Sequence, residues 1–346
     1  MKVLLIKTSS MGDVIHTFPA LTDMLRHCPN LQLDWVVEEQ FAALAGLHPA
    51  VHHVIPVAIR RWRRSLLNKN TYLEGLAFFR QLRVTRYDVI IDAQGLFKSI
   101  AIAVLAKGPC VGYALGFARE KWVSFFYRRR VPVGWGHHAV DRIRRLTSAA
   151  LTYPLPLSVP DYGLDRQRWQ IPGSDYVLFF HGTTWNNKQW PMAYWISLAK
   201  QLAAIGVLVK LSWGTPQEKE HSQLIAQACD RAQVLDALSI YDLLPVIASA
   251  KAVVGVDTGL CHLATALNVP TIALYGPTDA KKTGVMGGQQ ISLAADFSCA
   301  PCLRRKCRYE GAAIVWPACF SRLTPEIVFR ALSQMISLEP TAKSNS

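Results

Sequence analysis

Short apolar runs alternate with segments of helical pattern along almost the whole chain, and this alternation restricts the fold more than any other feature. In the first half, strands are expected at Val3–Ile6, Leu33–Val37, Val54–Val57, Val89–Asp92 and Val111–Tyr113, with helices at Phe18–His27 and Phe41–Leu47. In the second half, strands are expected at Tyr176–Phe180, Val207–Leu211, Val234–Leu235, Ala252–Val256 and Thr271–Leu274, with helices at Ala193–Ile205, Lys219–Cys229, Ile240–Ala248 and Leu260–Leu267. Such alternation predicts an α/β fold with doubly wound parallel sheets.

The length of the chain and a stretch interrupted by prolines and glycines predict two domains. A chain of 346 residues that is 51% apolar can bury two cores. Prolines and glycine interrupt residues 152–175 and no periodicity survives there, so this stretch is expected to be the linker. We therefore expect one domain over residues 1–160 and a second over 161–346, with a last helix at 325–336 and a disordered tail at 341–346.

Charge is distributed unevenly. Residues 1–160 hold 21 lysines and arginines against 10 aspartates and glutamates, within a net charge of +14 for the chain. The first half is therefore expected to meet an anion, which could be nucleic acid, an acidic membrane surface or a polyanionic small substrate. The longest apolar run, residues 99–106, is far shorter than a membrane span of ~20 residues, and no signal peptide is recognised. A cytoplasmic protein is expected.

Several enzyme classes lack their motif in this sequence. The first strand–helix turn contains one glycine, where a dinucleotide-binding fingerprint has three, and no phosphate-binding Gly-Lys-Ser/Thr loop occurs. A serine nucleophile elbow, a His-Glu-x-x-His zinc motif and an Asp-x-Asp metal pair are missing too. If the protein handles a diphosphate, side chains and helix ends must neutralise its charge.

Candidate site residues follow the strands. Asp13 is the only carboxylate in the turn after the first strand, and an Asp at that position is about equally expected to cap its helix. In the second half, Thr183, Thr184 and Lys188 offer hydroxyl groups and an ammonium group to a phosphate, although such residues taken alone belong more often to a plain surface loop. Asp257 begins a further turn that leads into a helix, whose N-terminus favours an anion.

These motifs together resemble the heptosyltransferase I group of the lipopolysaccharide heptosyltransferases. The resemblance is carried by K-T-S-S-M-G-D-V at 7–14, I-R-R-W-R-R at 59–64, D-A-Q-G-L at 92–96, H-G-T-T at 181–184 with Lys188, V-D-T-G-L-C-H-L at 256–263 and Y-G-P-T-D at 275–279. The group belongs to glycosyltransferase family 9. It has the GT-B architecture, in which two Rossmann-like domains face each other across a cleft.

The resemblance implies an inverting transfer of L-glycero-D-manno-heptose from ADP-heptose to the Kdo of Kdo-lipid A, a step in synthesis of the lipopolysaccharide inner core. It implies that no cofactor is required and that nucleic acid is not a partner. The enzyme would lie at the cytoplasmic face of the inner membrane, in peripheral contact with the anionic leaflet. The N-terminal domain would bind the acceptor and the C-terminal domain the nucleotide sugar.

Roles for individual residues follow from the same resemblance. Asp13 corresponds to the catalytic base, and Lys188 is expected to offset charge on the departing ADP. The nucleotide sugar is expected to contact Thr183, Thr184, Lys188, Glu218, Asp257, Thr258, Gly259 and His262. The acceptor, which carries phosphates and carboxylates, is expected to contact Ser10, Arg60, Arg61, Arg63, Arg64, His138 and Arg142. For the arginines, the competing interpretation is a solvated basic loop.

The sequence departs from the group in one region and leaves alternatives open. Cys299, Cys302, Cys307 and Cys319 form a cluster whose Cys-x-x-Cys half is typical of a zinc site. A reduced loop rich in arginine, or an occasional disulfide, is the simpler interpretation, and no catalytic metal is expected. A related heptosyltransferase that acts on a later core sugar is one alternative function. An anion-binding protein without enzymatic activity is another, and it would need neither Asp13 nor Lys188.

Overall fold

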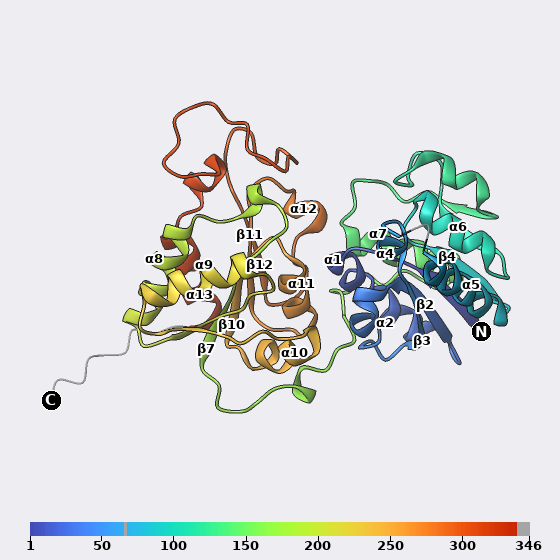
Figure 1. Ribbon diagram of the computed structural model, residues 1–346, viewed down its shortest axis with the longest axis horizontal. Helices are drawn as coiled ribbons and strands as arrows, with labels where there is room; N and C mark the ends of the chain where they lie inside the picture. Colours follow the sequence, from blue (N-terminus) through green and yellow to red (C-terminus); the bar gives the residue numbers. More distant parts are fainter. Residues whose placement is uncertain (66–67, 338–346) are drawn as a thin grey trace. The chain divides into compact units, whose positions relative to one another are not determined.

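The chain divides into two compact units, Met1–Leu164 and Asp165–Ser346. The computed structural model describes residues 1–65 and 68–337, and the expected disordered tail at 341–346 lies outside them. The division falls in the proline-rich stretch that follows the last helix of the first unit. Each unit is an α/β body with its own sheet (Figure 1).

The first unit is built on a six-stranded parallel sheet in the order β3-β2-β1-β4-β5-β6. Its strands are β1 (Lys2–Ile6), β2 (Gln32–Glu38), β3 (Val51–Val57), β4 (Val89–Asp92), β5 (Cys110–Tyr113) and β6 (Arg129–Val131). Consecutive residues of β1 and β5 are buried, which requires cover on both faces of the sheet.

Helices supply that cover in the first unit. They are α1 (Met11–Ile15), α2 (Phe18–His27), α3 (Ala42–Ala45), α4 (Ile59–Trp62), α5 (Lys69–Val84), α6 (Phe97–Leu105) and α7 (Ala139–Leu151), with 3-10 helices η1 (Glu39–Phe41) and η2 (Lys121–Phe126). Helix α2 packs against α7, which also contacts β4, β5 and β6, whereas α6 contacts β1 and β4 and packs against α5.

The second unit repeats this plan with the order β12-β11-β10-β7-β8-β9, again all parallel. Its strands are β7 (Tyr176–Phe180), β8 (Leu208–Leu211), β9 (Ala232–Val234), β10 (Ala252–Val256), β11 (Thr271–Tyr275) and β12 (Gln290–Ala294). Its helices are α8 (Met192–Ala204), α9 (Pro216–Gln227), α10 (Ile240–Ser249), α11 (Gly259–Ala266), α12 (Ala280–Thr283) and α13 (Pro325–Ile336), with 3-10 helices η3 (Arg166–Arg168), η4 (Asn186–Lys188) and η5 (Ala318–Arg322).

One face of the second sheet carries α8, α9 and α13, and the other carries α10 and α11 (Figure 1). All five residues of β7, β10 and β11 are buried, so these strands read as continuous apolar runs. The predicted fold class, two doubly wound α/β units, is confirmed. The strands β6 and β12 escaped prediction because β6 begins with two exposed arginines and β12 is only partly buried.

Candidate active site

The strand order places a topological switch point in each sheet. Numbered within its own unit, each sheet runs 3-2-1-4-5-6, so the first and fourth strands are neighbours: β1 and β4 in one unit, β7 and β10 in the other. The loops that leave two such strands turn to opposite faces and open a crevice at the carboxyl ends of the strands. Asp13 follows β1 and Asp257 follows β10, so both candidate carboxylates lie at switch points.

Asp13 is held by three groups of the first unit. Its Oδ1 lies 3.2 Å from Nζ of Lys7 and 3.2 Å from Nη2 of Arg119. Its Oδ2 accepts a hydrogen bond of 2.7 Å from the backbone N–H of Ser10, the residue before α1. Asp13 therefore caps its helix, and it is also the centre of a cationic cluster that capping alone does not require.

The electrostatics keep Asp13 ionised. Burial by itself would raise the pKa of the Asp13 carboxyl group, but the charges of Lys7 and Arg119 outweigh it and lower the pKa to about 2. Burial also lowers the pKa of Lys7 from its ordinary value, against the opposing effect of Asp13. A carboxylate that stays charged in a nearly enclosed turn can accept a hydrogen bond or a proton from a bound hydroxyl group.

Three cations beside Asp13 were missed by sequence reasoning. Lys7 directly follows the apolar residues of β1 and is buried, which is rare for a lysine without a partner, so its position could have signalled a site. Lys98 donates to Ser9 Oγ at 3.3 Å, and Arg119 lies in a loop that carries no recognisable pattern. The region around Asp13 is thus suited to an anionic ligand.

The other carboxylates near this part of the sequence have structural partners. Asp92 is fully buried and accepts hydrogen bonds from Ser99 Oγ at 2.8 Å and Tyr127 Oη at 2.7 Å, and burial raises its pKa. Asp23, on α2, forms a buried ion pair with Arg144 at 2.7 Å. Neither side chain is available to a substrate, so neither of them competes with Asp13 as the candidate base.

The four arginines at 60–64 lie in different surroundings. Arg61 is bound by two carboxylates, with Nη2 2.9 Å from Glu39 and Nη1 2.8 Å from Glu74. Those two hydrogen-bonded carboxylates raise the pKa of the Arg61 guanidinium above its ordinary value. Arg60, Arg63 and Arg64 are exposed, and within residues 1–65 and 68–337 none of the three forms an ion pair.

His138 and Arg142 have local partners. His138 precedes α7, and its Nδ1 accepts a hydrogen bond of 3.2 Å from the backbone N–H of Val140. The Arg142 guanidinium lies 3.8 Å from the ring centre of Trp135 and donates to the carbonyl oxygens of Gly134 and Phe117. Burial lowers the pKa of Arg142. His138 therefore caps α7, and Arg142 holds the loop before α7 and the turn at Phe117 against this helix.

In the second unit, Lys188 and Asp257 form the centre of a polar cluster. Lys188 Nζ lies 2.7 Å from Asp257 Oδ2, which also accepts a hydrogen bond of 2.7 Å from Thr278 Oγ1. Thr183 Oγ1 donates to the Asp257 carbonyl oxygen at 3.2 Å. Three sequence motifs from three strand ends, β7, β10 and β11, thus converge on one carboxylate.

The remaining nucleotide-sugar candidates surround this cluster. Thr258 precedes α11, Gly259 begins it, and buried His262 lies within it, whereas Thr184 is exposed. The start of α11 presents backbone N–H groups and the positive end of the helix dipole beside Asp257. Such an arrangement suits the negative charges of a diphosphate.

Glu218 comes close to the H-G-T-T turn. Its Oε2 accepts a hydrogen bond of 2.8 Å from the backbone N–H of Gly214. A Cβ atom on Gly182 would clash with the carboxylate of Glu218, so the glycine allows this carboxylate to lie against the turn. The structure therefore brings Glu218 to the same strand end as Thr183 and Lys188.

The cysteine cluster does not form a preassembled metal site. All four thiols are free, and within the described residues no three of their sulfur atoms lie within 4.8 Å of one another. Burial, helped by the other three thiols, raises the pKa of Cys319 to about 12. Asn187 binds the same loop by donating to the carbonyl oxygen of Arg304 at 2.9 Å.

A cavity of about 510 Å³ lies beside this loop in the second unit. His181, Trp190, His221 and Cys307 are among the residues that line it. None of the expected nucleotide-sugar contacts is in its lining, so we assign the candidate donor site to the cluster around Asp257 and not to this cavity.

Comparison with known proteins supports the resemblance seen in the sequence. The model of glycosyltransferase family 9 (heptosyltransferase) matches residues 76–313. Lipopolysaccharide heptosyltransferase 1 of Pseudomonas aeruginosa is 48% identical over an alignment of 355 positions, which covers 99% of this chain and 100% of that protein. The structure of E. coli heptosyltransferase WaaC with ADP has a TM-score of 0.86 at 39% identity and covers 97% of this chain and 100% of that one.

A second structure of the same enzyme holds ADP-2-deoxy-2-fluoro heptose; its TM-score is 0.83 at 39% identity, over 96% of this chain and 99% of that one. Two doubly wound units that match these structures over their full length define a GT-B glycosyltransferase. The chain belongs to glycosyltransferase family 9, the heptosyltransferase family. No helix among residues 1–65 and 68–337 has the length and apolar character needed to cross a membrane.

Proposed function

We propose that this enzyme transfers L-glycero-D-manno-heptose from ADP-heptose to the Kdo of Kdo-lipid A, with inversion at the anomeric carbon. The observation that carries the proposal is Asp13, an ionised carboxylate fixed by Lys7 and Arg119 at the switch point of the first sheet. The family membership and the name of the 48% identical relative, lipopolysaccharide heptosyltransferase 1, support heptose as the transferred sugar.

In the proposed reaction, a hydroxyl group of Kdo attacks the anomeric carbon of heptose and forms the new C–O bond. Its proton passes to Asp13 Oδ, and the bond between the anomeric carbon and the ADP oxygen breaks with its electron pair on ADP. A single base suffices, because ADP leaves as an anion that needs no strong acid. The pKa of about 2 makes Asp13 a weak base in the free protein.

Acceptor binding is expected to strengthen that base. The acceptor brings phosphates and carboxylates, and like charges beside a carboxylate raise its pKa. Arg119 is half-exposed and can pair with an acceptor anion, which would weaken its hold on Asp13. We assign the exposed Arg60, Arg63 and Arg64 to acceptor binding, with Ser10 beside the base, while Arg61, His138 and Arg142 hold the surrounding loops in place.

The second unit is proposed to bind ADP-heptose. Lys188 would turn from Asp257 to the diphosphate, whose charge is greater, and the hydroxyl groups of Thr183 and Thr184 with the start of α11 would complete the anion site. Asp257 would then accept hydrogen bonds from heptose hydroxyl groups, near His262. Glu218 would bind the nucleoside.

A patch of exposed aromatic residues supports peripheral contact with the cytoplasmic face of the inner membrane. Trp122, Phe125 and Phe126 of η2 are 67%, 56% and 58% exposed, and we call them the aromatic patch. Exposed Lys121 and residues 128–130, all arginine, flank the patch. Aromatic rings beside basic residues suit the headgroup region of an anionic bilayer.

Mass spectrometry of the product tests the proposal. The enzyme is incubated with ADP-heptose and Kdo-lipid A, and one heptose is expected to be added to the acceptor. Transfer only to an acceptor that already carries heptose would assign the enzyme to a later core sugar. Calorimetry with ADP-heptose supplies the second arm: no heat of binding and no transfer to either acceptor would favour an anion-binding protein without activity.

A further inference from the structure

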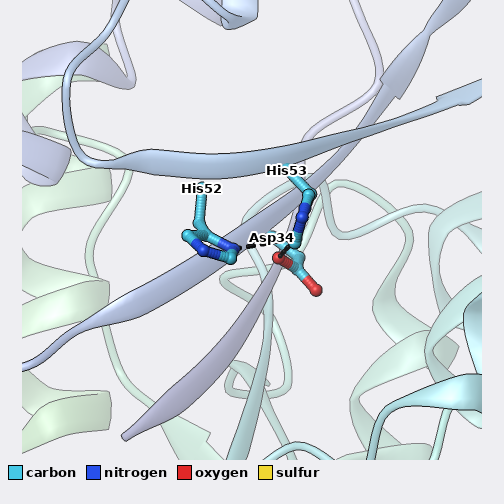
Figure 2. A group of neighbouring side chains, drawn as sticks. All are labelled: Asp34, His52 and His53. Carbon is cyan, nitrogen blue, oxygen red and sulfur yellow. Dashed lines mark hydrogen bonds and ion pairs between the residues drawn. The ribbon is translucent and has the colours of Figure 1, made fainter.

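Two histidines and one aspartate of the first unit meet at an irregularity between β2 and β3. The register pairs Leu33 with Val51 and then Asp34 with His53. His52 therefore has no register partner of its own on β2, and two residues of β3 lie opposite Asp34. Consecutive side chains of a regular strand point to opposite faces, and a bulge removes that alternation. The irregularity therefore brings both imidazoles to one place, with His53 beside the Asp34 carboxylate and His52 beside His53, as Figure 2 shows.

The distances within this group are short. His53 Nδ1 lies 3.1 Å from Asp34 Oδ1 and 2.8 Å from Nδ1 of His52. One potential ligand atom of each residue lies within 4.8 Å of the other two. Among the described residues, no other group of three or more histidine, cysteine, aspartate or glutamate side chains meets this condition. Around a tetrahedral zinc ion with bonds of about 2.0–2.1 Å, ligand atoms are separated by roughly 3.3 Å. The separations of 2.8 Å and 3.1 Å on either side of His53 Nδ1 are thus already near coordination spacing.

The carboxylate is oriented from the protein interior. Asp34 Oδ2 accepts a hydrogen bond of 2.8 Å from the hydroxyl group of Tyr87, which is 2% exposed. This bond directs the other oxygen, Oδ1, toward the imidazoles. Carboxylates that bind metal ions are commonly oriented in this way by a hydrogen bond to the second oxygen.

The protons available to these groups do not satisfy all of their lone pairs. Two imidazole Nδ1 atoms at 2.8 Å can share only one proton in their neutral forms, and Asp34 competes for the same proton. A metal ion satisfies all three lone pairs at once. Imidazole nitrogen with one carboxylate oxygen is a donor set that zinc and other divalent transition metals accept.

We propose that Asp34, His52 and His53 bind one divalent transition metal ion of the zinc class. His52 and His53 are exposed, so the ion can exchange with solvent and keeps room for water as a further ligand. The residues lie at the start of β3 and on β2, away from the strand ends that carry Asp13, so the ion has no part in sugar transfer. It would fasten the edge strand β3 to β2, and the inference is independent of the proposed function.

The test uses the full-length protein after treatment with a chelator. Cobalt(II) and then zinc are titrated in, and binding is followed by absorption and calorimetry. We expect one cobalt ion with visible d–d bands but without the near-ultraviolet charge-transfer absorption of a thiolate ligand. His53→Gln and Asp34→Asn should each weaken binding at least tenfold, while Cys302→Ser, which disrupts the cysteine cluster, should leave it unchanged.

Thermal unfolding in the presence of chelator serves as the folding control, and it should give the same midpoint for His53→Gln and for the unchanged protein. Zinc should then raise the midpoint of the unchanged protein and not that of the variant. Equal affinity in His53→Gln and the unchanged protein would overturn the proposal. A thiolate charge-transfer band lost in Cys302→Ser would also overturn it, because the ion would then belong to the cysteines.

Discussion

Lys188 and Asp257 form an ion pair of 2.7 Å although 69 positions of sequence separate them, and each side chain is mostly buried, at 15% and 10% exposure. The pair joins the turn after β7 to the turn after β10, the two neighbouring strands at the switch point of the second sheet. It keeps a lysine ready at the place where an anion is expected, and it keeps that lysine from being an isolated buried charge.

Replacing Lys188 by Ala is expected to lower kcat by about a hundredfold. A cation aimed at charge that develops on ADP stabilises the transition state by on the order of 3 kcal/mol. Steady-state rates with ADP-heptose and acceptor, together with a thermal melt, measure both effects of the change. Lys251→Ala is the matched control, because Lys251 forms a surface ion pair with Asp175 in the same unit at 3.3 Å.

A structural role for Lys188 would give a different result. If Lys188→Ala lowered the melting temperature and its folded fraction turned over at the full rate, the lysine would serve only to neutralise Asp257.

The exposed arginines are expected to act on acceptor binding. Arg64→Ala should raise the acceptor KM by about tenfold, because a charge-assisted hydrogen bond to a phosphate or carboxylate is lost. The KM for ADP-heptose should not change. Arg61→Ala is the comparison: it removes the partner of Glu39 and Glu74, so it should disturb the loop and its stability more than Arg64→Ala does. If Arg64→Ala left the acceptor KM unchanged at physiological salt, Arg64 would belong to a solvated basic loop without a role in acceptor binding.

The aromatic patch is expected to bind anionic vesicles. A double variant, Trp122→Ala with Phe125→Ala, should reduce co-sedimentation with vesicles of phosphatidylglycerol and phosphatidylethanolamine about tenfold, because two large rings no longer enter the interface. Activity on a short, water-soluble acceptor should be retained. Leu157→Ser, at a residue that is 95% exposed elsewhere in the first unit, is the control and should change neither. If the double variant bound vesicles as well as the unchanged protein, the aromatic patch would not be the membrane contact.

The fold was predictable because its strands are buried on both faces. Strands such as β7 and β10 are apolar at every position, and the turns that follow them contain the small and polar residues that open helices. A strand that carries exposed charge, such as β6, lacks this signal. The strand order, which brings β1 beside β4 and β7 beside β10, is a property of tertiary packing that no local pattern encodes.

The contacts of the site also divide into those between residues close in sequence, which could be predicted, and those that depend on tertiary structure, which could not. Asp13 and Lys7 are close in sequence and belong to one motif, so both are accessible to sequence reasoning, although the motif singles out only Asp13 as a candidate base. Arg119 reaches Asp13 from 106 positions away, out of a loop without periodicity. The group of Asp34, His52 and His53 depends on a register shift, which the sequence of an ordinary strand does not reveal.

Acid is expected to remove the stabilisation that Asp13 provides. Its pKa of about 2 in the folded protein lies below the unfolded value of roughly 3.9, so the folded state is favoured above the unfolded pKa and the gain is lost as pH falls through the folded pKa. The difference in unfolding free energy between the unchanged protein and Asp13→Asn should therefore be constant near neutrality, at about 2–3 kcal/mol, and should shrink between roughly pH 4 and pH 2. Urea unfolding at a series of pH values measures it, with Asp141→Asn, at a more exposed carboxylate, as the control.

Catalysis gives the sharpest test of Asp13. Asp13→Asn preserves the size of the side chain and an oxygen that can accept from the Ser10 N–H, so the start of α1 should remain intact. The amide cannot take the proton of an attacking hydroxyl group, and kcat should fall by at least about a hundredfold. Calorimetric binding of ADP-heptose should stay near that of the unchanged protein, because the donor is assigned to the other unit.

The same variant distinguishes the base from the helix cap. Asp13→Ala removes the cap as well, so it should lose more stability than Asp13→Asn in addition to activity. If Asp13→Asn kept most of its turnover and only Asp13→Ala were impaired, through instability, Asp13 would be a cap held by Lys7 and Arg119. Asp92 and Asp23 could not replace it, because Tyr127 and Arg144 already bind them. The base would then have to be sought elsewhere, either in another carboxylate at a strand end of this unit, such as Glu38 at the end of β2, or in a group of the acceptor itself.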